Sequence, residues 1–268
     1  MIKQILNRYG FSPDRLKGQH FLNDERLLEE EVEEAEIGGS DTVLEIGGGL
    51  GTLTRKLAER AGKVHTVEKD PQMVEILEKE LSDLENVEIH SSDVLDLDLP
   101  DFDKCVSNPP YQISSSIIEM LGRERKLSVL TFQKQFAKRL VASPGSKDYS
   151  RISVRCQMSF IPVYLKEIPA SSFLPEPEVD SALVKLYPRN DEIYTGDEEA
   201  FNRTIRALFT NRRKKIRNAF VDGRHILNIP KQKAKRMRDR IPHSEDRVNN
   251  LEVRELAEIS EFLEENLW

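Results

Sequence analysis

The chain has 268 residues, a formal net charge of −7 and two cysteines. This length allows a substantial core and either one large domain or a medium domain joined to a small one. Cys105 and Cys156 are far apart and form no CxxC pair, so the sequence indicates neither a disulfide framework nor a thiolate zinc site, and we expect no metal. No apolar run approaches the ~18 residues of a membrane span, and the first residues lack the apolar core of a signal peptide. We therefore expect a cytoplasmic protein without membrane contacts.

The first predicted element in chain order is a helical extension over residues 1–35, which we expect to line the functional site. Its acidic segment, residues 24–36, is typical of a solvated helix surface, and we assign it no function.

From about residue 42 to 186, short apolar runs rich in β-branched residues alternate with segments of helical period. This alternation predicts an α/β fold of the Rossmann-like kind. The predicted strands are residues 42–46, 64–67, 87–90, 104–107, 127–132, 160–167 and 182–187. No comparable helix separates the last two, so we expect them to pair antiparallel at the sheet edge. The first domain, residues 1–188, should therefore hold a seven-stranded, mostly parallel sheet.

The first predicted strand runs through Glu45 directly into a glycine-rich turn, EIGGGLG, at residues 45–51. Gly47 and Gly49 allow the backbone to pass close to a ligand at the start of the following helix. The spacing is Gly-x-Gly-x-Gly and lacks the Gly-x-Gly-x-x-Gly of dinucleotide-binding turns. It therefore favours S-adenosylmethionine, whose amino-acid end needs close backbone but no anion cradle.

Two acids end the next two predicted strands. Glu68 is about twenty residues beyond the glycines, where a carboxylate can accept hydrogen bonds from both ribose hydroxyls. Asp93, followed by Val94, can accept from an adenine amino group. Because the carboxyl ends of consecutive strands meet at one sheet edge, these residues and the glycine turn together predict a site for S-adenosylmethionine.

The fourth predicted strand ends in Asn108, Pro109, Pro110 and Tyr111. The prolines end the strand, remove two backbone donors and leave carbonyls free to face a cleft. An amino nitrogen on an aromatic ring is a poor nucleophile, and acceptors at the Asn108 side-chain oxygen and the Pro109 carbonyl can hold its two N–H groups while positive charge develops. Tyr111 can stack on a base that has left its helix. The same turn also suits methylation of a glutamine amide, so it predicts a planar nitrogen and does not specify RNA.

After residue 187 we expect a linker, and residues 197–268 are predicted to form a small all-α domain. Residues 203–240 carry 14 Lys and Arg against two acids, a balance of +12, which leaves −19 for the remaining chain. Such segregation is typical of a protein that docks one face on a polyanion.

Four segments resemble one family closely, the ribosomal RNA adenine dimethyltransferases of the KsgA type. They are GQHFLND at 18–24, EIGGGLG at 45–51, NPPY at 108–111 and FLPEPEVDS at 173–181. The resemblance implies a class I methyltransferase fold and S-adenosylmethionine as cofactor. It also implies dimethylation of two adjacent adenosines near the 3′ end of small-subunit (16S) rRNA, within a pre-30S particle during ribosome biogenesis. His20, where bacterial members usually carry asparagine, is similar to the archaeal or eukaryotic branch.

The resemblance also implies roles for residues outside the turns. His20 and Leu22 would line the cofactor site with Gly47, Glu68, Asp93 and Asn108, and Phe173 would give the target adenine a second aromatic face. Phosphate contacts would come from the basic side chains that open the C-terminal domain, Arg212, Arg213, Lys214, Lys215 and Arg217. We expect a monomer.

Three alternatives stay open at this point. The enzyme can act on another RNA, such as the large-subunit site associated with macrolide resistance, or on a protein glutamine, although the basic C-terminal segment argues against a protein substrate. It can also be an assembly factor whose catalysis is secondary.

Overall fold

The computed structural model describes residues 2–14, 18–194 and 196–267. The chain forms two compact units, which we describe separately. Residues 1–137 and 160–188 make up the first unit, and residues 138–159 and 189–268 the second.

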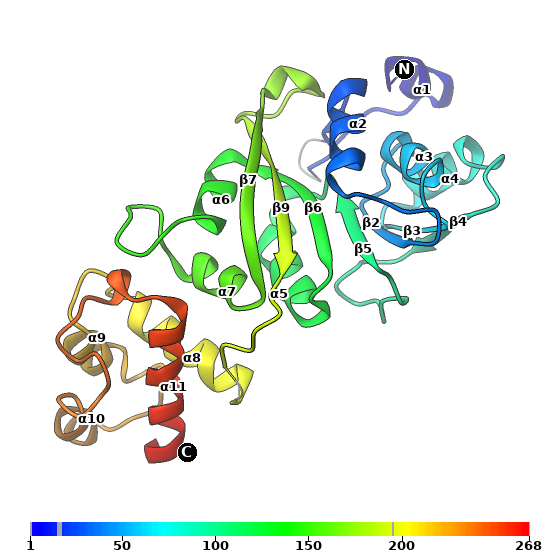
Figure 1. Cartoon of the computed structure of the whole chain (residues 1–268). Helices are drawn as coiled ribbons and strands as arrows, with labels where there is room; N and C mark the ends of the chain where they lie inside the picture. The colour runs from blue at the N-terminus through cyan, green and yellow to red at the C-terminus, as the bar shows by residue number, and fades with distance from the viewer. Residues whose placement is uncertain (1, 15–17, 195, 268) are drawn as a thin grey trace. The chain divides into compact units, whose positions relative to one another are not determined.

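The first unit is built on a seven-stranded sheet, as predicted. Its strands are β2 (Thr42–Ile46), β3 (Lys63–Glu68), β4 (Val87–Ser91), β5 (Lys104–Ser107), β6 (Leu127–Gln133), β7 (Phe160–Ile168) and β9 (Ser181–Pro188). Their order is β4-β3-β2-β5-β6-β9-β7, with β4 and β7 at the edges (Figure 1). β9 runs antiparallel to both β6 and β7, and the other neighbouring pairs are parallel. The expected antiparallel pair at the sheet edge is confirmed.

The chain reverses direction across the sheet between β2 and β5. From β2 it moves outward through β3 to β4, then returns to place β5 on the other side of β2. In open α/β sheets, ligands bind outside the carboxyl ends of the strands at such a switch point. The topology therefore places the predicted site residues of four strands around one crevice.

The helices of this unit are α1 (Ile2–Tyr9), α2 (Glu25–Glu34), α3 (Thr52–Ala58), α4 (Pro71–Glu80), α5 (Ser114–Glu124) and the first half of α6 (Lys134–Leu140), whose last three residues belong to the second unit. α2 and α3 share a buried apolar cluster with one face of the sheet, where Val43, Val64 and Val129 point. Because side chains alternate along a strand, their neighbours Leu44, His65 and Leu130 point to the opposite face.

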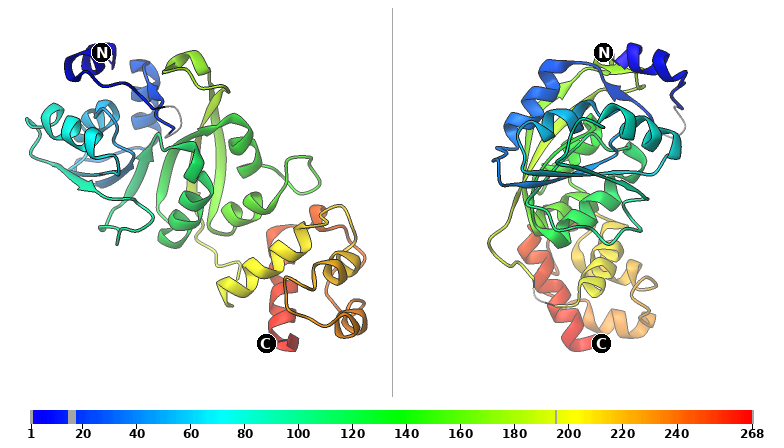
Figure 2. Two further views of the ribbon diagram at one scale, coloured as in Figure 1. Left: turned by 180° about the vertical axis from the view of Figure 1, so that it is seen from behind. Right: turned by 90° about the vertical axis from the view of Figure 1, so that its right-hand side faces the viewer.

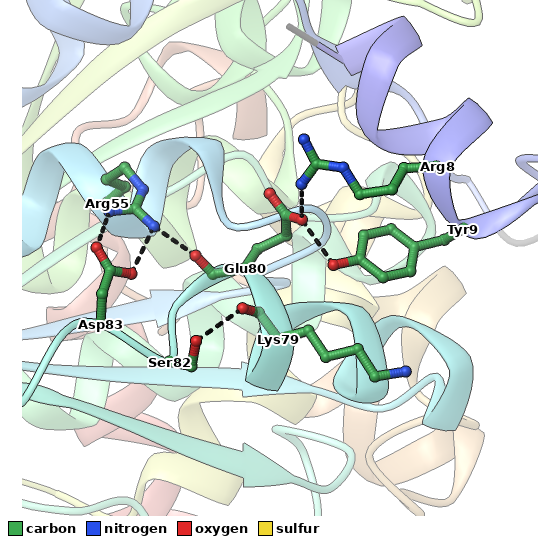
Figure 3. A network of polar contacts seen from close by, with 7 residues as sticks. All are labelled: Arg8, Tyr9, Arg55, Lys79, Glu80, Ser82 and Asp83. Atoms are coloured by element: carbon green, nitrogen blue, oxygen red, sulfur yellow. Dashed lines mark hydrogen bonds and ion pairs between the residues drawn. The ribbon is translucent and has the colours of Figure 1, made fainter.

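α1 is attached to the first unit by a carboxylate at the end of α4 (Figure 3). Glu80 accepts hydrogen bonds from Arg8 at 2.6 Å and from the Tyr9 hydroxyl at 2.7 Å. On the other side, Arg55 of α3 bonds to both carboxylate oxygens of Asp83 at 2.9 Å. Ile2, Ile5 and Leu6 of α1 are buried in the same region. The N-terminal helix is therefore attached by two hydrogen bonds to Glu80 and by one apolar face.

A short two-stranded ribbon joins the N-terminal extension to the loop between β7 and β9. It pairs β1 (Phe21–Leu22) with β8 (Phe173–Leu174), so that Leu22 lies opposite Phe173. The ribbon brings the segments GQHFLND and FLPEPEVDS together, although about 150 residues separate them.

The second unit is helical, as predicted, and its helices contribute to one buried apolar core. Figure 2 shows the helices after residue 197, coloured yellow to red, packed close to one another. They are α7 (Arg151–Ser159), α8 (Glu198–Phe209), α9 (Ile216–Gly223), α10 (Lys231–Met237) and α11 (Val253–Leu267). Two details differ from the expected organisation. Residues 138–159 belong to this unit, not to the first, because Tyr149 and Val154 are buried in its core. The expected linker is also shorter, since Tyr194 is buried there and Asp197 caps α8.

Candidate active site

A pocket opens at the carboxyl ends of β2, β3, β4 and β5. Its walls come from residues 18–21, the glycine turn after β2, the end of β3, the segment after β4 and the turn after β5. Of the residues expected at the site, the following line it: His20, Gly47, Gly49, Glu68, Asp93, Val94, Asn108 and Pro110. Four strands and the N-terminal segment therefore meet at one pocket, and the N-terminal contribution comes from an extended segment and not from a helix.

The glycine turn adopts a backbone that side chains rarely tolerate. Gly47 has φ +81° and Gly49 has φ +55°, both in the left-handed region. A Cβ on Gly49 would also lie 3.2 Å from the Phe21 ring. Glycine at these positions keeps this wall of the pocket open to a ligand.

Glu68 is held by backbone groups on both sides of the pocket floor. One carboxylate oxygen accepts from the Gly49 amide at 3.1 Å and the other from the Asp70 amide at 2.9 Å. Burial raises the pKa of Glu68, and these amide donors work against that rise. A carboxylate offers about four acceptor sites, so Glu68 keeps capacity to accept from a ribose hydroxyl.

Asp93 and Val94 form the adjacent wall. Asp93 accepts from the Leu95 amide at 3.1 Å through Oδ1, and its Oδ2 is 3.5 Å from the Lys69 ammonium. Val94 is buried and gives an apolar surface beside the carboxylate. One polar edge and one apolar face are the combination that binds a heteroaromatic ring.

Asn108 has one satisfied and one unsatisfied end. Its Nδ2 donates to Glu31 Oε2 at 2.9 Å. Its Oδ1 is buried and has no hydrogen-bond partner within the described residues. A buried acceptor without a donor is unusual, since most such groups are paired. The side chain is therefore poised to accept one more hydrogen bond.

Glu31 is a functional candidate that the sequence interpretation missed. The helix α2 was expected to be a solvated acidic surface, but Glu31 is only 1% exposed. Burial raises its pKa to about 8, opposed by the hydrogen bond from Asn108 and reinforced by repulsion from Glu45. A signal was present in the spacing, because Leu28, Glu31 and Val32 follow the i, i+3, i+4 pattern of a buried helix face.

Tyr111 and His20 lie beside the turn after β5. The Tyr111 hydroxyl is 2.6 Å from Ser181 Oγ. Its ring is nearly parallel to that of His20, with 6.4 Å between the centroids. His20 is itself fixed by a contact of 2.8 Å between Nδ1 and the Pro175 carbonyl. Both rings are thus held in place before any ligand binds.

Other expected site residues lie behind the pocket wall. Leu22 and Phe173 are buried in the apolar cluster beneath α2, and neither lines the pocket. Pro109 and Tyr111 flank the pocket without lining it. The role of Phe173 as a second aromatic face stays a prediction.

The basic residues expected to contact RNA lie in the second unit. Arg213, Lys214, Lys215 and Arg217 line one groove, together with Arg238 and Arg247. Lys214 pairs with Asp222 at 2.7 Å and Lys215 with Glu245 at 2.6 Å. Arg212 instead donates to the Lys147 carbonyl at 2.9 Å and to the Tyr149 carbonyl. Its guanidinium therefore bonds to backbone carbonyls, whereas Lys214 and Lys215 pair with carboxylates.

Comparison with known proteins identifies the family. Residues 14–265 match the family model described as "Ribosomal RNA adenine dimethylase". The chain belongs to this family. A "Probable ribosomal RNA small subunit methyltransferase A" from Methanococcoides burtonii is 44% identical over 98% of the chain and 97% of its own length. The protein of that name from Thermococcus kodakarensis is 43% identical over 97% and 93%.

Two solved structures extend the likeness to the fold. A dimethyladenosine transferase from Plasmodium falciparum has a TM-score of 0.80 at 28% identity, and covers 91% of this chain and 98% of its own. The 23S rRNA methyltransferase ErmE has a TM-score of 0.66 at 26% identity, over 91% and 99%. The Rossmann-like methyltransferase fold and the family inferred from the four segments are both confirmed. Among the described residues, the helices are all too short or too polar to cross a membrane.

Proposed function

We propose that this protein transfers methyl groups from S-adenosylmethionine to the N6 amino group of adenosine in small-subunit rRNA, and dimethylates two adjacent adenosines near the 3′ end. The observation that carries the proposal is the buried Asn108 Oδ1, which has no donor within the described residues and lies at a pocket with a glycine-rich wall. Membership of the rRNA adenine dimethylase family supports the same reaction.

The residues of the pocket fit the proposed cofactor. The open glycine turn can admit its amino-acid end. Glu68 has acceptor capacity left for the ribose, and Asp93 with Val94 offers an acceptor beside an apolar face. Bound S-adenosylmethionine would supply an electrophilic methyl group on a sulfonium centre.

The turn after β5 would make the adenine nitrogen reactive. Its lone pair is delocalised into the ring, and attack requires the nitrogen to approach tetrahedral geometry. Asn108 Oδ1 and the Pro109 carbonyl would accept hydrogen bonds from its two N–H groups. These bonds would hold that geometry and stabilise the positive charge that develops. The fixed Tyr111 ring would stack on the flipped base. The proton would leave to solvent after transfer, so neither a strong base nor a metal ion is required.

We propose a pre-30S particle in the cytoplasm as the substrate, bound by one copy of the protein. The groove around Arg213, Lys214, Lys215 and Arg217 suits phosphate contacts, which position RNA without reading its bases. The ion pairs in this groove are exposed and weak, so phosphates can compete for the cations.

The test is transfer of labelled methyl from S-adenosylmethionine to immature small subunits that lack these methyl groups. We expect label in N6,N6-dimethyladenosine at two adjacent positions near the 3′ end of the rRNA, located by mass spectrometry. Absence of label from adenosine would refute the proposal.

A second substrate is favoured by one observation, the likeness of the fold to a 23S rRNA methyltransferase. The same assay with large-subunit RNA separates the two. Label confined to the large-subunit RNA would replace the first proposal.

A further inference from the structure

Glu31 lies behind the pocket and is linked to it through a single side chain. It is 1% exposed and does not line the pocket. Its Oε2 accepts from Asn108 Nδ2 at 2.9 Å, and its Oε1 is 3.5 Å from Thr131 Oγ1. Within the described residues, no basic side chain pairs with it. The main contact of this buried acid is therefore Asn108.

The two ends of the Asn108 amide have opposite hydrogen-bonding character. If the amide turned over, Nδ2 would face the pocket and oppose the N–H groups of an adenine amine. In the structure Glu31 Oε2 accepts from Nδ2, and with Nδ2 engaged there Oδ1 is the end of the amide left without a partner. The contact with Glu31 therefore determines which atom the pocket receives.

We propose that Glu31 is a positioning residue for methyl transfer, holding the Asn108 amide so that its oxygen faces the target amine. The inference rests on the proposed function, because it assigns Glu31 a part in the same reaction. Burying a carboxyl group costs free energy, and an apolar side chain at this position would avoid that cost. Charged and titratable neighbours do not offset that cost, since Glu45 repels it and Cys105 is a neutral thiol nearby.

The test compares Glu31→Leu with Glu31→Gln. Leu removes the acceptor at similar volume, and we expect kcat to fall roughly 30-fold or more, as for loss of a group that orients reacting atoms. The Kd for S-adenosylmethionine should stay within about threefold of wild type, because Glu31 does not contact the pocket. Gln retains an acceptor oxygen and should recover kcat to within about fivefold. Thr131→Val is the matched control, since it removes the other contact of Glu31 and should leave kcat nearly unchanged.

The outcomes separate this inference from the proposed function. If wild-type protein fails to label adenosine, the proposed function fails. If wild type labels adenosine and Glu31→Leu does so equally fast, the positioning role is wrong. A second measurement on wild type covers the case in which the Leu variant does not fold. The Asn108 Nδ2 hydrogens, assigned by their loss in Asn108→Ala, should exchange with solvent at least tenfold more slowly than those of exposed Asn7 by NMR. Equal exchange rates would overturn the proposal.

A separate observation concerns the sheet face opposite α2 and α3. His65 on β3 pairs in register with Glu88 on β4, and His90 follows two residues later on the same face. His65 Nδ1 is 2.9 Å from His90 Nε2 and 3.6 Å from the Glu88 carboxylate, which is 3.7 Å from His90 Nε2. Within the described residues this is the only group of three His, Cys, Asp or Glu with ligand atoms so close together.

These distances between candidate ligand atoms fit an ion with tetrahedral coordination. Zn²⁺ bound at ~2.0–2.1 Å keeps its ligand atoms ~3.3 Å apart, and imidazole nitrogen with carboxylate oxygen is a common zinc donor set. We infer a second site, for a divalent transition metal ion, formed by His65, Glu88 and His90. Glu88 is half exposed, which leaves room for a water ligand. Lys63, 2.8 Å from Glu88, would have to give up that contact.

Zn²⁺ alone serves as the probe. Isothermal titration of the metal-free chain should give one ion per chain with a Kd at or below the micromolar range, and His90→Ala should weaken it at least tenfold. His225→Ala, at an exposed histidine elsewhere, is the matched control and should bind as wild type. Binding that is absent, or unchanged by His90→Ala, would refute the site. The readout needs no methyl transfer and is independent of the proposed function.

Discussion

At the scale of single residues, two buried acids lie close to the pocket and differ in what they contact. Glu45 and Glu31 are each 1% exposed, and burial raises the pKa of both to about 8. Glu45 accepts a hydrogen bond from Thr54 at 2.6 Å and ties α3 to β2, whereas Glu31 contacts Asn108. The contact of Glu45 joins two elements of the fold, whereas the contact of Glu31 is with a residue that lines the pocket.

Replacing Asn108 by Ala should remove the acceptor for the adenine amine. We expect kcat to fall at least ~100-fold, the usual cost of losing one preorganised group that stabilises transition-state charge. Binding of small subunits should persist, because the proposed phosphate contacts lie in the second unit and not at Asn108. Filter binding and single-turnover labelling measure the two effects. Asn7→Ala, at an exposed asparagine outside the pocket, is the control and should transfer methyl groups at the wild-type rate. Equal loss of binding and transfer in Asn108→Ala would contradict the separate roles.

Glu45 should make stability depend on pH. The pKa of Glu45 is about 8 when folded, against ~4.3 in an unfolded chain. Between these values the folded state holds a proton that the unfolded state releases, so the contribution to stability is full below about pH 4 and is lost as pH rises through 8. Glu45→Gln cannot ionise and keeps an acceptor for Thr54. We therefore expect the unfolding free energy of Glu45→Gln to rise relative to that of wild type by about 4 kcal/mol from pH 5 to pH 8.

Denaturant unfolding at several pH values measures that difference directly. Glu85→Gln, at an exposed position, should show no comparable change with pH. If the difference in unfolding free energy between Glu45→Gln and wild type did not change with pH, Glu45 would be ionised in the folded protein.

At the scale of elements, strands were more predictable than helix faces. Strands buried on both sides read as short apolar runs, and β2 and β5 begin and end where the sequence placed them. The acidic composition of α2 hid its buried stripe, because the average over the helix outweighed the spacing of Leu28, Glu31 and Val32. The site residues at strand ends followed from topology, whereas the link from Glu31 to Asn108 spans 77 residues and has no local signature.

The contact between α8 and α9 should be intolerant of even one methyl group. A Cβ on Gly223 would lie 2.5 Å from the Ala207 carbonyl oxygen, which is backbone and cannot move aside cheaply. Gly223→Ala is therefore expected to destabilise the helical unit by about 1–3 kcal/mol, despite the better helix propensity of alanine. Gly39→Ala, where no atom lies within 4 Å, is the matched control. Circular dichroism measures the thermal unfolding temperature of each variant. If Gly223→Ala and Gly39→Ala both unfolded at the wild-type temperature, the close contact would be refuted.

At the scale of the whole molecule, the basic segment of the sequence and the helical unit have different boundaries. The basic segment covers residues 203–240, whereas the helical unit also includes residues 138–159. The sequence segregates +12 into residues 203–240 and leaves −19 elsewhere, which composition alone reveals. The assignment of residues 138–159 to the helical unit could not be read locally. It depends on Tyr149, whose hydroxyl donates to the Leu251 carbonyl at 2.9 Å and whose ring lies 5.9 Å from that of Phe209. Contacts across about 100 residues leave no periodic trace in either partner.

The charge segregation should appear as a salt dependence of RNA binding. Each phosphate neutralised contributes ~0.7 to 0.9 to the slope of log K against log salt. Replacing Arg213, Lys214 and Lys215 together by Gln should therefore lower the slope by about 2 to 3. Arg212 is left intact, because its contacts with the Lys147 and Tyr149 carbonyls would confound the result with unfolding.

The control must remove three positive charges without touching the groove. Lys3, Lys79 and Lys166 are exposed in the first unit, and their joint replacement by Gln makes the net charge change identical. If phosphates contact the groove, only the first triple variant changes the slope. If the effect is one of net charge, both variants weaken binding alike through the long-range field, which low salt exaggerates. An unchanged slope for the groove variant would remove this surface from the RNA interface.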